Sequence, residues 1–145
     1  AEPFSLSGTL IGFLFLVYLL GIWSSNAAGK LVSKRGAKSI LLGSLVLMLL
    51  GALLCLVSLL PVIIGGLALF TTGFFAAHAV ASGLVGQRAG GAKAQASALY
   101  LCAYYLGSSV LGYAMGWVWQ HWGWLPLIGC LAAALLLAVA RAWRL

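Results

Sequence analysis

His78 is the only ionisable side chain that lies well inside a long apolar stretch of this sequence. If that stretch crosses a membrane, the histidine is a candidate functional residue, because an ionisable group at membrane depth is stable only where it faces protein or water. An imidazole could line a cavity and hydrogen-bond a hydroxylated ligand, or carry a proton near neutral pH. It could also be a neutral histidine satisfied by a hydroxyl or carbonyl of a neighbouring helix. The residue alone leaves these alternatives open.

Hydroxyl side chains recur at helical spacing around this histidine and in the next apolar stretch. At about 100° per residue, Thr71, His78 and Ser82 share one helix face, and Tyr104 and Ser108 share a face of the following segment. Because polar stripes at membrane depth need a bundle interior or water, we expect three segments to line a shared polar interior. The predicted cavity-lining residues are Thr71, His78, Ser82, Tyr104, Ser108 and Tyr18.

The sequence carries no motif for other chemistry. It has no carboxylate pair, no H-E-x-x-H, no Walker loop and no G-x-S-x-G elbow, which argues against a hydrolase or an ATP-driven pump. Cys55, Cys102 and Cys130 lie in apolar runs without C-x-x-C spacing, so we interpret them as small buried hydrophobic residues and not as a metal or redox site. We therefore expect no enzyme activity, no metal and no cofactor.

The elements that must position these residues are long apolar helices. The 145 residues are 64% hydrophobic and 6% charged, whereas soluble domains carry about 25% charged residues. Five stretches reach the length of about 20 residues that a spanning helix needs, and they do not alternate as barrel strands do. The sequence predicts an all-α membrane protein with spans at about 5–27, 39–59, 62–84, 95–118 and 124–143. The second and fifth are almost wholly apolar, so we expect them to be outer, lipid-contacting helices.

The basic residues fall on one side of this predicted topology. The chain has eight Lys and Arg residues against one acidic residue, Glu2. The basic residues lie between spans one and two, between spans three and four, and after span five, which are all on the same face. Cytoplasmic loops are enriched in Lys and Arg, so we predict the N-terminus outside and the C-terminus in the cytoplasm. This clustering predicts a lipid bilayer as the partner, not nucleic acid. The predicted interface anchors are Trp117, Trp119, Trp122, Trp124 and Trp143.

The fourth span has a second face, on which Tyr105 and Ser109 precede two glycines. Gly112 and Gly116 form a small-xxx-small pair, which lets two membrane helices approach closely. The predicted helix-packing glycines are Gly107, Gly112 and Gly116.

The string G-K-L-V-S-K-R-G-A-K at 29–38 resembles the major facilitator superfamily loop motif G-x-L-x-D-R-x-G-R-R. Ser33 replaces the aspartate, and Ala37 replaces the first of the closing basic pair. The positions that match in kind are Gly29, Leu31, Lys34, Gly36 and Lys38. The stretches 73–78, 95–100, 104–117 and 121–124 are similar to helices 10 to 12 of bacterial inner-membrane drug and sugar exporters of that superfamily.

This resemblance implies that 1–145 is an incomplete C-terminal half, helices 8 to 12, of a transporter with two six-helix halves. Helix 7 and the N-terminal half would be missing partners. The third span would line the cavity, the first and fourth would gate it, and the 29–38 loop would stabilise the outward-facing state. The implied function is secondary active export of a small organic solute, such as a sugar or drug, by alternating access in the bacterial inner membrane.

Two other functions stay open from the residues alone. The chain could be a small membrane scaffold or partner-binding subunit without transport activity, which the gene sequence upstream of Ala1 would distinguish. A channel-forming oligomer would need a polar face continuous along one helix, and none of the five segments has one.

Overall fold

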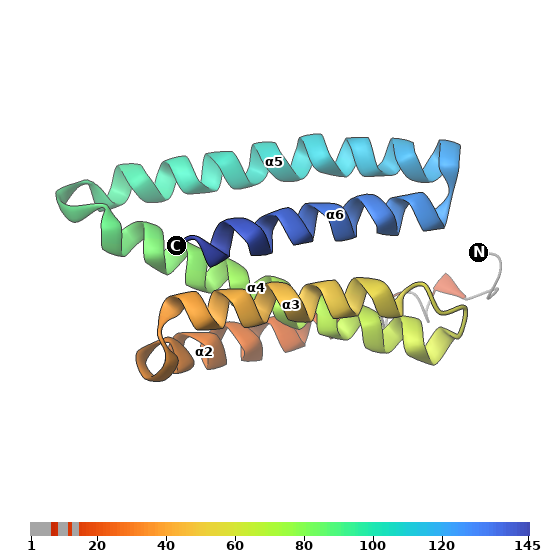
Figure 1. Cartoon of the computed structure of the whole chain (residues 1–145), viewed down its shortest axis with the longest axis horizontal. Helices are drawn as coiled ribbons and strands as arrows, with labels where there is room; N and C mark the ends of the chain where they lie inside the picture. Colours follow the sequence, from red (N-terminus) through yellow and green to blue (C-terminus); the bar gives the residue numbers. More distant parts are fainter. Residues whose placement is uncertain (1–6, 9–11, 13–14) are drawn as a thin grey trace.

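In the computed structural model, which describes residues 7, 8, 12 and 15–145, the chain is a bundle of helices joined by short turns (Figure 1). The elements are η1 (Phe15–Val17), α2 (Tyr18–Arg35), α3 (Ala37–Leu54), α4 (Leu60–Arg88), η2 (Gly90–Ala92), α5 (Lys93–Trp122) and α6 (Trp124–Trp143). Among the described residues, five helices are long and apolar enough to cross a membrane. The predicted all-α fold with five spanning segments is confirmed.

Helix boundaries differ from the predicted spans mainly at the turns. The first predicted span, 5–27, starts outside the described residues, and its helix continues to Arg35. The second ends earlier than predicted, at Leu54. The third starts at Leu60, with Pro61 in its first turn, where a missing N–H leaves no hydrogen bond unmade. The fourth is longer at both ends, and the fifth has the predicted bounds 124–143.

The motif at 29–38 is not the predicted loop. α2 continues through Arg35, α3 begins at Ala37, and Gly36 alone separates them with a φ of +80°. Glycine adopts this left-handed backbone readily, and its N–H donates to the Val32 carbonyl at 2.9 Å, which closes the helix. The motif therefore forms a helix end, a one-residue break and a helix start. Gly29, Leu31 and Lys34 lie in α2, and Lys38 lies in α3.

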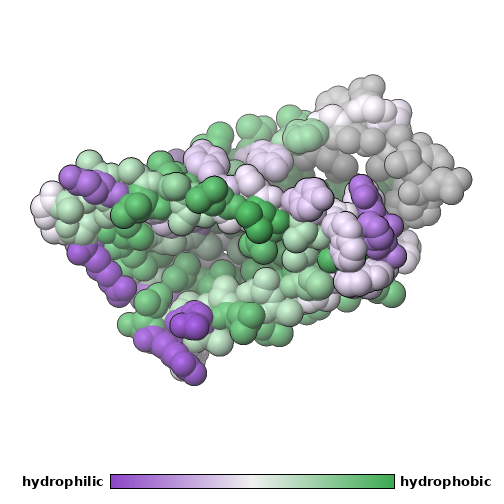
Figure 2. Space-filling model, turned by 90° about the horizontal axis from the view of Figure 1, so that it is seen from above, coloured by the Kyte–Doolittle hydropathy of each residue, from purple (hydrophilic) through white to green (hydrophobic). Residues whose placement is uncertain are grey.

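The helices form two layers that α4 connects. In Figure 1, α2 and α3 lie together, α5 and α6 lie together, and α4 crosses from the first pair to the second. The α2–α3 and α4–α5 connections and the C-terminus lie at one end, and the other two connections lie at the opposite end. We call the first end the basic end, defined by Lys30, Lys34, Arg35, Lys38, Arg88, Lys93, Arg141 and Arg144. Figure 2 shows hydrophilic side chains at this end, beside a mainly apolar surface.

The interior of the bundle is mainly apolar, and Ser24, Ser44 and Thr71 are the buried polar side chains among the described residues. Its buried cluster comes from α2, α3, α4 and α6 and consists of Ala28, Leu41, Met48, Ala52, Ala77, Val80, Leu135 and Ala142. α5 buries only Val118. The prediction that the second and fifth spans are outer helices, with a polar interior shared by the first, third and fourth, is therefore wrong for these five helices. Small residues such as Gly51 and Ala52 let α3 pack closely in the centre of the bundle.

Glycines set the distance between α3 and α4. A Cβ added to Gly51 would lie 2.6 Å from the Gly66 carbonyl oxygen, and one added to Gly73 would lie 2.6 Å from the Ser44 carbonyl oxygen. The two backbones are thus in near contact at two levels. The glycines predicted for helix packing differ, because an added Cβ at Gly107, Gly112 or Gly116 meets no atom of the described chain within 4 Å. Their role in helix packing stays a prediction, because the contacts among the described residues do not test it.

We expect Gly66→Leu to push α3 and α4 apart, because even the new Cβ would lie 2.7 Å from the Gly51 carbonyl oxygen. Overpacking of this kind destabilises a core by about 1–3 kcal/mol. Thermal unfolding of the full-length protein in detergent measures the change. Gly65→Leu is the matched control, because its Cβ meets nothing within 4 Å. Equal melting temperatures for the two variants would contradict this account of the α3–α4 contact.

Candidate functional site

Aromatic rings form a continuous row across α2, α4 and α5. Tyr18 contacts Phe75 with ring centroids 5.9 Å apart, Phe75 contacts Phe74 at 5.4 Å, and Phe74 contacts Tyr104 at 6.3 Å. We call this row the aromatic band, made of Tyr18, Phe75, Phe74, His78, Tyr100, Tyr104 and Tyr105. It joins the three segments that were predicted to act together, although it lies outside the buried cluster.

Close packing fixes the α2 side of the band. A Cβ added to Gly21 would lie 2.5 Å from the Phe75 ring, so only glycine leaves room for that ring. Ser25 Oγ also donates to the Phe75 carbonyl oxygen at 3.4 Å. The outermost rings are open to the surroundings, since Tyr18 is 56% exposed and Tyr105 is 63% exposed. The band therefore starts and ends on a surface that the described chain does not cover.

His78 lies at the centre of the band and is half-buried between α4 and α5. The Tyr100 hydroxyl lies 3.0 Å from His78 Nδ1, and it also donates to the His78 carbonyl oxygen at 3.4 Å. The Tyr104 ring packs beside the imidazole with centroids 4.7 Å apart. The geometry supports a histidine satisfied by a neighbouring hydroxyl. The second ring nitrogen, Nε2, could donate a hydrogen bond to a ligand or accept one from it, depending on the tautomer.

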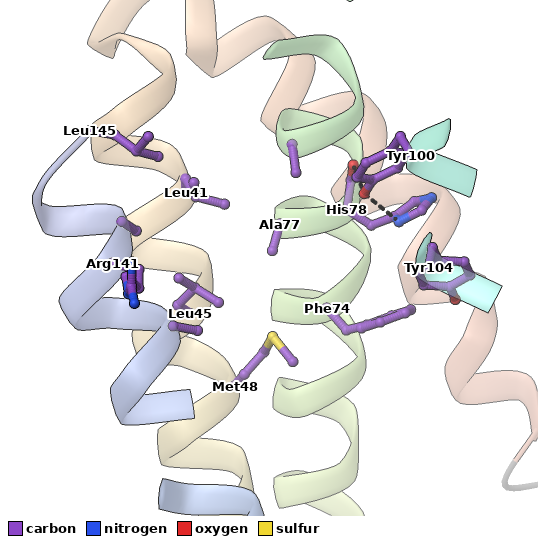
Figure 3. A pocket seen from close by; sticks show the side chains of 13 residues that line it. Leu41, Leu45, Met48, Phe74, Ala77, His78, Tyr100, Tyr104, Arg141 and Leu145 are labelled. Carbon is purple, nitrogen blue, oxygen red and sulfur yellow. Dashed lines mark hydrogen bonds between the residues drawn. The ribbon is translucent and has the colours of Figure 1, made fainter. Parts of the chain in front are cut away.

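A cavity of about 470 Å³ lies against this centre (Figure 3). Its walls come from α3, α4, α5 and α6 and are mainly apolar, with His78, Tyr100, Tyr104 and Arg141 as the polar or basic side chains. In Figure 3, Leu45 and Met48 lie opposite the His78 side of the cavity. An apolar hollow with a few placed polar groups is typical of a small-molecule site. This arrangement could hold a flat or apolar solute and form one hydrogen bond to it through His78.

Two of the six predicted cavity-lining residues, His78 and Tyr104, line this cavity. Tyr100 was missed, although it lies one helical turn before Tyr104 and so shares its face. Ser108 is exposed, and its hydroxyl donates to the Tyr105 carbonyl oxygen at 2.9 Å. Thr71 is buried one turn before Phe75. Neither they nor Ser82 and Tyr18 line this cavity.

At the end opposite the basic end, a tryptophan side chain links two helix connections. Trp124 Nε1 donates to the Cys55 carbonyl oxygen at 2.8 Å, which ties the start of α6 to the α3–α4 turn. Trp124 therefore has a role in packing besides the predicted anchoring at the membrane interface.

Cys55 and Cys130 are half-buried, whereas Cys102 is exposed on α5, contrary to the prediction that all three are buried. In the described part of the chain, no three His, Cys, Asp or Glu side chains are grouped to hold a metal.

The chain is similar over nearly its whole length to bacterial transporters. It is 43% identical over 137 residues to the uncharacterized MFS-type transporter YybF of Bacillus subtilis, which covers 94% of this chain and 34% of YybF. It is 44% identical over 144 residues to the inner membrane transport protein YnfM of Escherichia coli, covering 99% of this chain and 34% of YnfM. An uncharacterized transporter of Buchnera aphidicola is 41% identical over 144 residues, covering 99% and 35% of the two chains.

The chain thus spans about a third of the length of the curated relatives it matches. No protein-family model and no solved structure matches it. The predicted resemblance is confirmed by relatives that share two residues in five along five membrane-spanning helices. The chain belongs to the MFS-type transporters, the major facilitator superfamily.

Proposed function

We propose that this chain provides helices 8 to 12 of a secondary active transporter, and that the complete protein exports a small organic solute, such as a sugar or drug, by alternating access. The observation that carries the proposal is the His78–Tyr100 pair, because it places a hydrogen-bonding group in a mainly apolar cavity of small-molecule size, about 470 Å³. Relatives named as transporters favour this function over a membrane scaffold.

The uncovered faces of α2 and α5 support a missing half as the partner. α5 is exposed along almost its whole length, and Tyr113 on it is 81% exposed. Gly112 and Gly116 have open space above them, as a closely approaching helix would require. In the proposed mechanism the second half covers the aromatic band, and the two halves rock around a solute between them. Thr71, Ser82, Ser108 and Tyr18 stay predicted lining residues of the solute cavity in that assembly.

The proposed topology has the basic end in the cytoplasm of a bacterial inner membrane. All three basic clusters share that end, and positive charge is enriched on the cytoplasmic side of such membranes (Figure 1). We infer that the helix break at Gly36 stabilises the outward-facing state. The last turn of α2 carries Lys34 and Arg35, which can pair with helix ends of the other half.

We expect His78→Ala in the full-length protein to raise the apparent KM for the exported solute about tenfold. The reason is that losing one hydrogen bond to the bound solute removes about 1–3 kcal/mol of binding free energy. Tyr100→Phe should give a smaller rise, because the imidazole remains but loses the hydroxyl beside Nδ1. Efflux would be measured in cells loaded with ethidium, or with radiolabelled arabinose, using whichever solute the unmodified protein exports.

His121→Ala is the matched control, because His121 stacks on Trp117 at the other end of α5, away from the cavity. It should leave the apparent KM unchanged. If His78→Ala leaves affinity, rate and pH dependence of efflux unaltered, His78 has no part in solute binding.

Sidedness can be tested with single cysteines in a protein whose Cys55, Cys102 and Cys130 are replaced by serine. Ser33→Cys lies at the basic end and Gln120→Cys at the opposite end, and both positions are exposed. We expect a membrane-impermeant maleimide to label Gln120→Cys in intact spheroplasts and Ser33→Cys only after permeabilisation. The reverse pattern would mean that the basic end faces outward.

A further inference from the structure

The cavity beside His78 continues to the basic end of the bundle. A second cavity of about 430 Å³ shares Leu41, Ala81 and Leu145 with the first and reaches Arg88 at the end of α4. The two hollows form one groove between the α3–α6 side and the α4–α5 side, which we call the basic-end groove. It runs from the middle of the bundle to the ends of α4 and α6.

The groove has a polar end and an apolar body. Arg88 and Arg141 are the only charged residues that line it, and both are exposed. The rest of the wall is mostly apolar, with Leu41, Leu45 and Ala81 as examples. The sequence has one acidic residue, Glu2, so no Asp or Glu side chain within residues 15–145 can pair with either guanidinium. The charge therefore favours an anionic occupant.

Both arginines lie at the ends of membrane-spanning helices, where lipid headgroups would meet the bundle. Arg88 is the last residue of α4, and Arg141 lies in the last turn of α6. Trp143, two residues after Arg141, is 70% exposed, as is typical of a side chain at the membrane interface. A ligand that binds both parts of the groove must have a negative head at this depth and an apolar tail reaching into the membrane.

We propose that the basic-end groove binds an anionic phospholipid of the surrounding bilayer. The phosphate lies between Arg88 and Arg141, because guanidinium groups bind phosphate oxygens through paired, charge-assisted hydrogen bonds. One acyl chain lies along Leu41, Ala81 and Leu84 in the second cavity, which leaves the His78 end of the first cavity to the solute. Basic pockets between membrane helices on the cytoplasmic side favour such headgroups. The lipid fills the space between α5 and the rest of the bundle, where α5 buries only Val118.

The test uses the full-length protein, purified in detergent and analysed by native mass spectrometry with added phosphatidylglycerol or phosphatidylcholine of the same acyl chains. We expect the unmodified protein to retain phosphatidylglycerol preferentially. Arg88→Gln with Arg141→Gln should weaken that retention about tenfold or more, since it removes charge-assisted hydrogen bonds. Lys93→Gln with Arg144→Gln changes the charge equally at the same end, outside the groove, and should have little effect.

Ala81→Trp separates a bound lipid from a bound free anion. Ala81 lines both cavities, so an indole there should block the acyl chain and abolish phosphatidylglycerol retention while both arginines remain. Equal retention of the two lipids, equal losses in the groove and control variants, or an unaffected Ala81→Trp protein would overturn the proposal. Displacement of phosphatidylglycerol by millimolar inorganic phosphate would also overturn it. If the variants do not fold, the lipid comparison on the unmodified protein decides.

Discussion

The near contact between the backbones of α3 and α4 is the constraint on which the other helix positions depend. Lipid tails are as apolar as leucine, so membrane helices associate through close packing and not through exclusion of water. Gly51, Gly66 and Gly73 allow that packing, because a side chain at any of them would meet the facing helix. Once α4 is held there, Phe75 meets α2 and His78 meets α5. The position of the aromatic band therefore depends on the glycines of the α3–α4 contact.

The number and type of helices could be predicted because the bilayer fixes both. An apolar chain in lipid must satisfy its backbone internally, and the membrane thickness sets the helix length. The helix ends were predicted less well. Lys34 and Arg35 mark the edge of the membrane by charge, but both are good helix formers, so α2 continues through them until Gly36. Charge located the interface correctly, whereas backbone conformation decided where the helix ends.

The packing partners could not be predicted from residue types. Gly112 and Gly116 on α5 have the spacing of packing glycines, yet it is Gly51 and Gly66 that meet across a helix pair. Nothing local distinguishes the two sets, because the choice depends on which faces tertiary packing brings together. The candidate site was predicted only in part, because its lining also depends on tertiary packing. Helical spacing placed His78 correctly beside α5, but the predicted polar interior is mainly apolar because α3 occupies the centre.

The position of α5 depends more than that of any other helix on molecules outside the described chain. It is attached to α4 through ring contacts and the Tyr100 hydroxyl, and it buries only Val118. One of its faces carries the open glycines and exposed tyrosines that a second transporter half would cover, and another borders the groove proposed for lipid. A helix held by few contacts of its own can move at low energetic cost. A partner on each side would then determine both where α5 lies and how far the His78 cavity opens.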